Sequence, residues 1–190
     1  MKRIVIFASG SGTNVENIAT YFKGSDQVSV TAVLTNKRDA KVLDRCDALH
    51  LNALYFNRTS FVNSDCVLTI LEALDPDLIV LAGFLWKVPD AIVDRFPSKI
   101  INIHPALLPK YGGKGMYGMK VHEAVIEDRE VETGITIHFV NAHYDEGTII
   151  HQSKIAILPG DTPESIAKKV HALEYENYPK IIAQLLHGQT

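Results

Sequence analysis

The chain has 190 residues, and its 19 Lys and Arg against 22 Asp and Glu give a formal net charge of −3 with His neutral. Apolar residues make up 46 % and charged residues 22 %, which excludes a disordered chain and predicts a single domain with a real core. The absence of a basic cluster argues against an extended nucleic-acid or membrane-surface footprint, and two cysteines, Cys46 and Cys66, are too few for a disulfide framework or zinc knuckle.

Apolar, β-branched runs alternate with amphipathic stretches through the first half of the chain. The runs that predict buried strands cover residues 3–8, 29–34, 78–82 and 99–103, with a weaker one near 54–56. The stretches that predict helices cover residues 14–22, 38–50, 61–74 and 89–95. This alternation predicts an α/β fold, a Rossmann-like open, mostly parallel, twisted sheet flanked by helices.

The second half has a different pattern. Residues 131–140 and 148–157 read as two strands joined by the polar segment 141–147, which predicts antiparallel strands at one edge of the sheet. Residues 163–186 read as a terminal helix. Residues 110–118 carry four glycines and read as a mobile loop. No internal repeat or linker divides the chain, and we expect one domain over residues 1–190.

A glycine loop follows the first predicted strand and leads into a helix. Residues 8–14 read Ala-Ser-Gly-Ser-Gly-Thr-Asn, an arrangement that aims free backbone N–H groups at an anion such as phosphate. A dinucleotide site would need a third glycine where Val15 stands, and a triphosphate loop would need a Gly-Lys-Ser/Thr sequence that is missing. A monophosphate cradle remains, with a plain glycine turn capped by Asn14 as the alternative.

Two polar side chains interrupt the predicted strand 99–103 at its carboxyl end. Asn102 and His104 are two residues apart and therefore point to the same side, at the edge where open α/β sheets place their active sites. An Asn amide and a His imidazole could together stabilise an oxyanion and move a proton. The alternative for His104 is a buried imidazole with a structural hydrogen bond.

The predicted loop 141–147 is rich in titratable groups. One of His143, Asp145 and Glu146 could fold back onto His104, orient its ring and favour the imidazolium form, and the pattern does not choose among the three. A metal site built from His138, His143, Asp145 and His151 matches no standard zinc spacing. His138 and His151 also fit solvent-facing positions on their strands, so we expect no metal.

Five motifs occur in order along nearly the whole chain: residues 8–14, Leu-Ala-Gly-Phe at 81–84, Asn-Ile-His-Pro-Ala-Leu-Leu-Pro-Lys-Tyr at 102–111, Thr-Gly-Ile-Thr-Ile-His-Phe-Val at 133–140 and Asp-Glu-Gly at 145–147. Together they resemble the formyltransferase superfamily and, within it, the folate-dependent enzymes that formylate phosphoribosylglycinamide (GAR). The resemblance implies transfer of the formyl group of 10-formyltetrahydrofolate, as co-substrate, to the amine of GAR in purine (IMP) biosynthesis, without a metal.

The resemblance also assigns site residues. The implied catalytic residues are Asn102, His104 and Asp145, with Asp145 holding His104 in its charged form. The implied GAR phosphate loop is Gly12, Thr13 and Asn14. The implied folate pocket is Leu85, Trp86, Lys87, Val88 and Asn102. His122 and Arg58 are possible further contacts, with a helix-capping surface position as the alternative for His122.

The implied organisation is a single formyltransferase domain. Its N-terminal half would bind the phosphate substrate, and its C-terminal half would bind folate and supply the catalytic loop. We expect only small-molecule substrates, no nucleic acid and no membrane, in a monomer or homodimer. No targeting or transmembrane segment is evident, so we also expect a soluble, cytoplasmic protein.

Three other functions remain open on sequence grounds: a formyltetrahydrofolate hydrolase, a formyltransferase for another amine acceptor, and a non-catalytic module that binds folate or a phosphosugar. The first two normally carry an additional domain, for which a chain of 190 residues leaves no room. A pure binding module has no need of Asn102, His104 and Asp145. The short chain and the loop at Gly12 therefore favour GAR as the acceptor.

Overall fold

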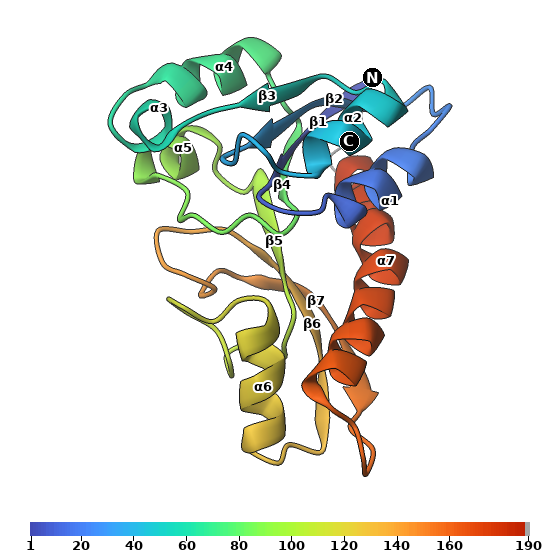
Figure 1. Cartoon of the computed structure of the whole chain (residues 1–190). Coiled ribbons are helices and arrows are strands. Elements are labelled where there is room, and N and C mark those ends of the chain that lie inside the picture. The colour runs from blue at the N-terminus through green and yellow to red at the C-terminus, as the bar shows by residue number, and fades with distance from the viewer. Residues whose placement is uncertain (189–190) are drawn as a thin grey trace.

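One sheet joins all the strands found in residues 1–188, the part of the chain that this computed structural model describes (Figure 1). Its order is β3-β2-β1-β4-β5-β6-β7. The strands are β1 (Lys2–Ala8), β2 (Val28–Thr35), β3 (Ala53–Tyr55), β4 (Leu78–Leu81), β5 (Ile100–His104), β6 (Glu132–Phe139) and β7 (Ile149–Ala156). The first five are parallel, whereas β6 and β7 are antiparallel. The predicted α/β sheet with antiparallel strands at one edge is confirmed.

Helices cover both faces of this sheet. One face carries α1 (Thr13–Tyr21), α2 (Val42–Leu49) and α7 (Pro163–His187), and the other carries α3 (Arg58–Val62), α4 (Cys66–Leu74) and α5 (Asp90–Arg95). The β1 side chains alternate between them: Ile4 and Ile6 pack in the first core, Val5 and Phe7 in the second. A strand buried on both faces must be apolar along its length, which explains the continuous apolar runs of the sequence.

The helices differ from the prediction in three places. The helix expected over 61–74 is two helices, α3 and α4. The residues between them, Asn63, Ser64 and Asp65, favour side-chain hydrogen bonds to the local backbone over continuation of the helix. Ser64 Oγ, for example, accepts from the Cys66 amide at 3.4 Å. The helix expected over 38–50 begins only at Val42, whose amide donates to the Gly10 carbonyl. A further helix, α6 (Met119–Glu127), directly follows the glycine loop and packs against α7.

The strand order reverses between β1 and β4, because β1 pairs with β2 on one side and with β4 on the other. At such a point the loops leave the sheet in opposite directions and open a crevice outside the strand ends. Here the loops after β1 and β4 are joined, since the Ser9 amide donates to the Gly83 carbonyl at 3.1 Å and the Leu85 amide donates to Ser9 Oγ at 3.0 Å. No helix within residues 1–188 has the length and apolar character needed to cross a membrane.

Candidate active site

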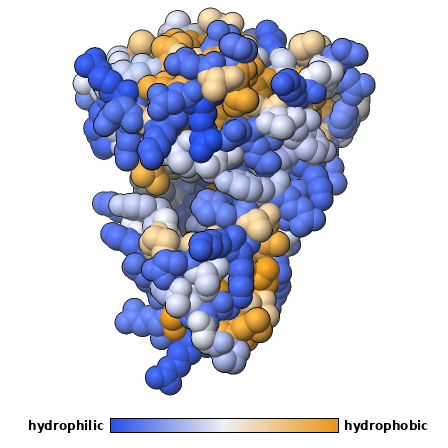
Figure 2. Space-filling view, turned by 45° about the vertical axis from the view of Figure 1, so that its right-hand side comes forward, coloured by the Kyte–Doolittle hydropathy of each residue, from blue (hydrophilic) through white to orange (hydrophobic). Residues whose placement is uncertain are grey.

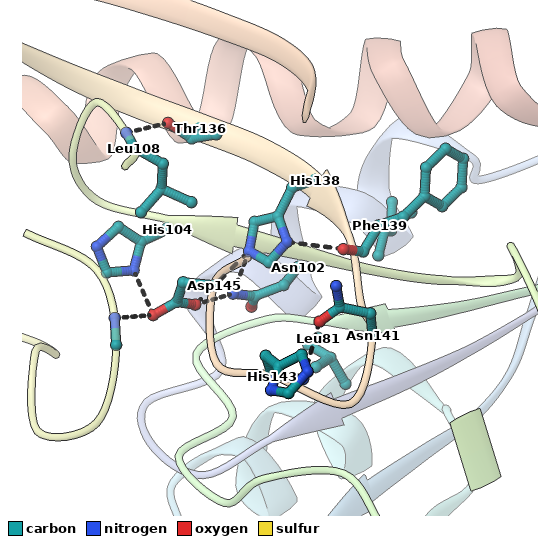
Figure 3. A network of polar contacts seen from close by, with 12 residues as sticks. Leu81, Asn102, His104, Leu108, Thr136, His138, Phe139, Asn141, His143 and Asp145 are labelled. Carbon is teal, nitrogen blue, oxygen red and sulfur yellow. Dashed lines mark hydrogen bonds and ion pairs between the residues drawn. The ribbon is translucent and has the colours of Figure 1, made fainter. Parts of the chain in front are cut away.

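Three side chains from β5 and the loop after β6 meet beside this crevice (Figure 3). Asn102 and His104 project from the same side of β5, as the strand period predicts. Asp145 reaches back from the loop that joins β6 to β7, with its Oδ2 3.6 Å from His104 Nδ1 and its Oδ1 3.4 Å from Asn102 Nδ2. The structure therefore brings together all three residues that the resemblance assigns to catalysis.

The His104 ring is held by a backbone carbonyl. Its Nε2 lies 2.7 Å from the Tyr111 carbonyl oxygen, and because a carbonyl only accepts, Nε2 carries the hydrogen. In the neutral ring Nδ1 is then the bare nitrogen, and it faces Asp145. The proton that His104 gains or loses is therefore the one on Nδ1.

Burial and charge act in opposite directions on His104. The residue is 3 % exposed, and this burial lowers its pKa, while the Asp145 carboxylate and the Tyr111 carbonyl raise it. Burial prevails, and the pKa of His104 lies below its ordinary value. The Asp145 carboxylate therefore favours the charged ring, as expected, but in the free protein it does not outweigh the cost of removing the ring from water.

Asp145 itself stays ionised. Burial raises its pKa, but His138, His104 and the Gly113 amide together outweigh burial and leave the pKa below its usual range. The amide contact is a hydrogen bond of 2.9 Å from Gly113 N to Asp145 Oδ2. Of the three candidates in the loop 141–147, Asp145 is the one whose carboxylate reaches His104, while His143 and Glu146 are exposed.

His138 belongs to this network, although its strand position also fitted a solvent-facing side chain. It is 2 % exposed; its Nδ1 donates to the Phe139 carbonyl, and its Nε2 lies 3.2 Å from Asn102 Nδ2 and 3.6 Å from Asp145 Oδ1. His151 bonds instead to Ser153 on β7. No group of three or more His, Cys, Asp or Glu within the described range 1–188 is arranged to hold a metal ion.

A cavity of about 510 Å³ lies against these side chains and extends to the glycine loop after β1. Its walls include residues 10–14, Asn102, His104, Asp145, and, from α6 and α7, His122 and Glu174. Figure 2 shows the molecule hollowed near its middle, between a wider and a narrower part. Ligand cavities typically measure about 300–1,000 Å³, so this one has the size of a small-molecule site.

The far end of the cavity has unsatisfied polar atoms. Gly12 is the N-cap of α1 with φ +74° and offers no side-chain cap, so the first amides of the helix stay free for an anion. Asn14 is not a cap: its Nδ2 donates to Glu174 Oε2 at 2.9 Å, and its Oδ1 is buried with no partner among residues 1–188. His122 is also buried rather than a surface cap, and its Nδ1 is similarly unpartnered.

Gly12 is required by the shape of this loop. A Cβ at this position would lie 2.5 Å from Val42 Cγ2 and 2.8 Å from the Val42 Cα, in addition to the positive φ. We expect Gly12→Ala to lower the free energy of unfolding by about 1–3 kcal/mol, measured by urea denaturation. Gly10→Ala is the matched control, because no atom lies within 4 Å of its Cβ position. Equal losses in the two variants would contradict the assignment.

A second, smaller cavity of about 60 Å³ adjoins the first and shares Phe84, Asn102, Tyr144 and Asp145 with it. Its walls include Trp86, Lys87, Val88 and Asn102, four of the five residues expected to contact folate. The fifth, Leu85, lines the larger cavity instead. The Arg58 guanidinium lies over the Trp86 ring, 5.4 Å from the ring centroid.

Sequence reasoning missed Glu174 as a residue of this site, and it missed the structural role of His138. Glu174 stands in the middle of a long helix, where an acidic residue normally faces water, and no local pattern distinguishes it. His138 carried a weak signal, because a polar residue in an otherwise apolar strand is costly unless it is paired. Glu174 contacts Asn14 and also His171, whose pKa it raises by a hydrogen bond.

Comparisons with known proteins match this chain to formyltransferases along nearly its whole length. Residues 2–182 match the family model described as formyl transferase. The chain is 37 % identical to phosphoribosylglycinamide formyltransferase, chloroplastic, of Arabidopsis thaliana, over 97 % of this chain but 65 % of that protein, just under two thirds of its length. It is 36 % identical to phosphoribosylglycinamide formyltransferase of Haemophilus influenzae, over 100 % of this chain and 89 % of the relative.

A solved structure gives the same result. Glycinamide ribonucleotide transformylase 1 from Symbiobacterium toebii superposes with a TM-score of 0.89 at 32 % identity, covering 99 % of this chain and 89 % of that one. The match of fold and the match of sequence therefore extend over the same residues, and they confirm the resemblance drawn from the motifs. The chain belongs to the formyl transferase family, whose phosphoribosylglycinamide formyltransferase members it matches along its full length.

Proposed function

We propose that this protein transfers the formyl group of 10-formyltetrahydrofolate to the amine of GAR, giving formyl-GAR and tetrahydrofolate. The observation that carries this proposal is the junction of two cavities at Asn102 and Asp145, with His104 lining the larger one. A group transfer needs two substrates whose reacting atoms meet, and the polar side chains of the site gather at that junction. The family relationship supports the same reaction.

The larger cavity is the proposed GAR site. The phosphate would sit on the first amides of α1, at Gly12, Thr13 and Asn14, where the helix dipole and the free N–H groups favour an anion. Glu174, joined to Asn14, offers a buried carboxylate that can accept hydrogens from the ribose hydroxyls. His122 supplies a further unpartnered nitrogen on the path toward His104.

The smaller cavity is the proposed site for the folate ring. Trp86 and Val88 provide apolar walls, while Lys87 and the nearby Arg58 provide positive charge for folate carboxylates. Leu85 would contact folate from the side of the larger cavity. A volume of 60 Å³ is well below that of ordinary ligand sites, so the ring enters only if the exposed side chains of the loop 141–147 move outward.

Asn102 would act on the formyl oxygen. As the GAR amine attacks the formyl carbon, negative charge develops on that oxygen, and positioned donors stabilise it. Asn102 Nδ2 donates at 3.2 Å to His138 and at a long 3.4 Å to Asp145, so the second hydrogen is cheaply redirected to the substrate. The bond to His138 keeps the amide in place during this exchange.

His104 would move the proton. It enters neutral, because burial lowers its pKa, and it takes a proton on Nδ1 from the attacking amine. The imidazolium forms 3.6 Å from Asp145, whose carboxylate stabilises it once it is charged. The same proton then passes to the folate nitrogen as its bond to the formyl carbon breaks, and His104 returns to its starting state.

We propose that residues 1–190 act as one domain on small-molecule substrates in a monomer or homodimer, located in the cytoplasm and without nucleic-acid or membrane partners. Each cavity draws on both halves of the chain: Glu174 from α7 lines the phosphate side, and Trp86 from the first half lines the smaller cavity. The division between the two substrates therefore follows the cavities rather than the midpoint of the chain.

A spectrophotometric assay of folate product formation tests the proposal. The protein is supplied with 10-formyltetrahydrofolate or its dideaza analogue, with and without GAR. We expect turnover that depends strictly on GAR. Turnover without GAR would replace the proposal with a hydrolase, and no turnover with either mixture would leave a binding module or another amine acceptor.

A further inference from the structure

The backbone segment Tyr111, Gly112 and Gly113 contacts both titratable groups expected to act in catalysis, His104 and Asp145. The Tyr111 carbonyl accepts from His104 Nε2 at 2.7 Å, and the Gly113 amide donates to Asp145 Oδ2 at 2.9 Å. Between them, a Cβ on Gly112 would lie 3.3 Å from the Asp145 Cβ and 2.6 Å from Leu108 Cδ2. This segment, residues 111–113, therefore lies directly against the pair and sets the separation of its members.

The backbone of this segment is not in a relaxed conformation. Tyr111 has φ +58°, in the left-handed region that is uncommon for a residue other than glycine, and particularly for a bulky one. Such conformations persist only where the surrounding structure fixes them. The carbonyl that accepts from His104 belongs to this same residue, so what holds Tyr111 also holds the His104 ring.

The Tyr111 hydroxyl supplies that restraint. It donates to Asp128 Oδ2 at 2.7 Å and lies 3.0 Å from Glu130 Oε1, which also accepts from Lys110 Nζ at 2.7 Å. Asp128 follows α6 and Glu130 precedes β6, so the hydroxyl is tied to the α6–β6 connection. Burial and the two carboxylates raise the pKa of Tyr111, so its hydroxyl keeps the hydrogen that it donates.

We propose that Tyr111 is a positioning residue for the formyl transfer: its hydroxyl, anchored by Asp128 and Glu130, fixes the backbone segment that orients His104 and Asp145. The inference rests on the proposed function for its kinetic readout. Tyr111 reaches the reaction through His104, so its loss changes the chemical step rather than substrate binding. The anchor lies at a third cavity, of about 310 Å³, lined by Tyr111 and Glu130.

Tyr111→Phe tests the proposal, because it removes the hydroxyl and keeps the ring. We expect kcat to fall about 10-fold or more, since small displacements of positioned groups cost up to about 100-fold, while KM for GAR and for the folate changes less than about threefold. Nitrogen NMR of the free protein gives a second readout. Weaker contact with the Tyr111 carbonyl moves the His104 titration to lower pH. Asp145, His138, Glu174 and His122 are further charged or titratable groups that interact with this ring.

Two sets of variants separate anchoring from other effects. Lys110→Ala removes the other partner of Glu130 without touching the hydroxyl, and we expect kcat and the His104 titration to stay unchanged. Asp128→Ala combined with Glu130→Ala removes both acceptors, and we expect it to reproduce Tyr111→Phe and to add no further loss in that background. Asp128→Asn in place of Asp128→Ala in this double variant keeps one acceptor oxygen and should restore most of the lost activity.

The outcomes distinguish this proposal from the proposed function. If the parent protein shows no GAR-dependent turnover, the function fails, and the His104 titration in Tyr111→Phe still decides whether the anchor orients the ring. If the parent turns over and Tyr111→Phe keeps kcat within twofold with an unmoved titration, the anchor has no positioning role. A rise in KM with unchanged kcat would also overturn it, because that pattern belongs to a substrate contact.

Discussion

Replacing His104 by alanine is expected to lower kcat for formyl transfer by about 10²–10⁴-fold, the range for a lost acid–base group. KM for GAR should change by no more than about threefold, because the proposed phosphate contacts are Gly12 and the free amides of α1 rather than His104. The measurement is a steady-state assay over a range of both substrates.

The size of this effect follows from how the ring is fixed. With Nε2 committed to the Tyr111 carbonyl, His104 presents a single proton-accepting atom, Nδ1, toward Asp145 and the cavity. Both ring nitrogens of His138 have other partners, since its Nδ1 donates to the Phe139 carbonyl at 2.8 Å and its Nε2 lies 3.2 Å from Asn102 Nδ2.

His151→Ala is the matched control for this experiment. His151 stands on β7 and bonds to Ser153, outside the network at Asp145, so the variant should keep parental turnover. Measurements of Tm and circular dichroism check that His104→Ala, which removes a buried ring, leaves the fold intact. Added imidazole should restore part of the lost rate. If His104→Ala retains turnover within a few fold of the parent, with the fold intact, the proton-transfer role is wrong.

The parts of the fold that follow from local chemistry were predictable. The core strands are apolar along their whole length because helices cover both faces, so β1, β4 and β5 stand out as continuous runs. The break between α3 and α4 and the presence of α6 were not predictable, because short helices depend on packing and local capping rather than on a long periodic pattern. Strand alternation alone placed Asn102 and His104 on one side.

The rest of the site depends on distances that a sequence does not contain. The sequence gives no reason to choose among His143, Asp145 and Glu146 as the partner of His104. Only the path of the loop brings Asp145 to 3.6 Å from His104. Glu174 comes from α7, far along the chain from Asn14, and pairs with it only after α7 packs against α1. The net direction of the His104 pKa was not predictable for the same reason, because the lowering effect of burial is a property of the folded protein.

Asp145→Asn is expected to lower kcat by about 10²–10³-fold, comparable to the loss of a positioned electrostatic group, with little change in GAR affinity. The substitution is close in shape, and the Asn oxygen can still accept from the Gly113 amide, so the loop 141–147 should keep its path. What disappears is the negative charge that stabilises the imidazolium once His104 has taken a proton. Calorimetric binding of GAR and steady-state kinetics separate the two effects.

The pH dependence has a definite sign. Asp145 raises the pKa of His104 against the lowering effect of burial, so removing its charge must move the pKa further below the ordinary value of about 6.5. NMR titration of the His104 ring in the free protein should therefore show its midpoint at lower pH in Asp145→Asn than in the parent. The amine of GAR is absent from this measurement, so its own ionisation cannot produce the shift.

Glu146→Gln provides the control, because it neutralises the adjacent carboxylate in the same loop, which is exposed. This variant should keep both the parental kcat and the parental His104 titration. An Asp145→Asn titration that stays in place, or moves to higher pH, would show that the carboxylate does not act on the ring. A lowered kcat with an unmoved titration would instead assign Asp145 to orienting Asn102, with which it shares the contact at 3.4 Å.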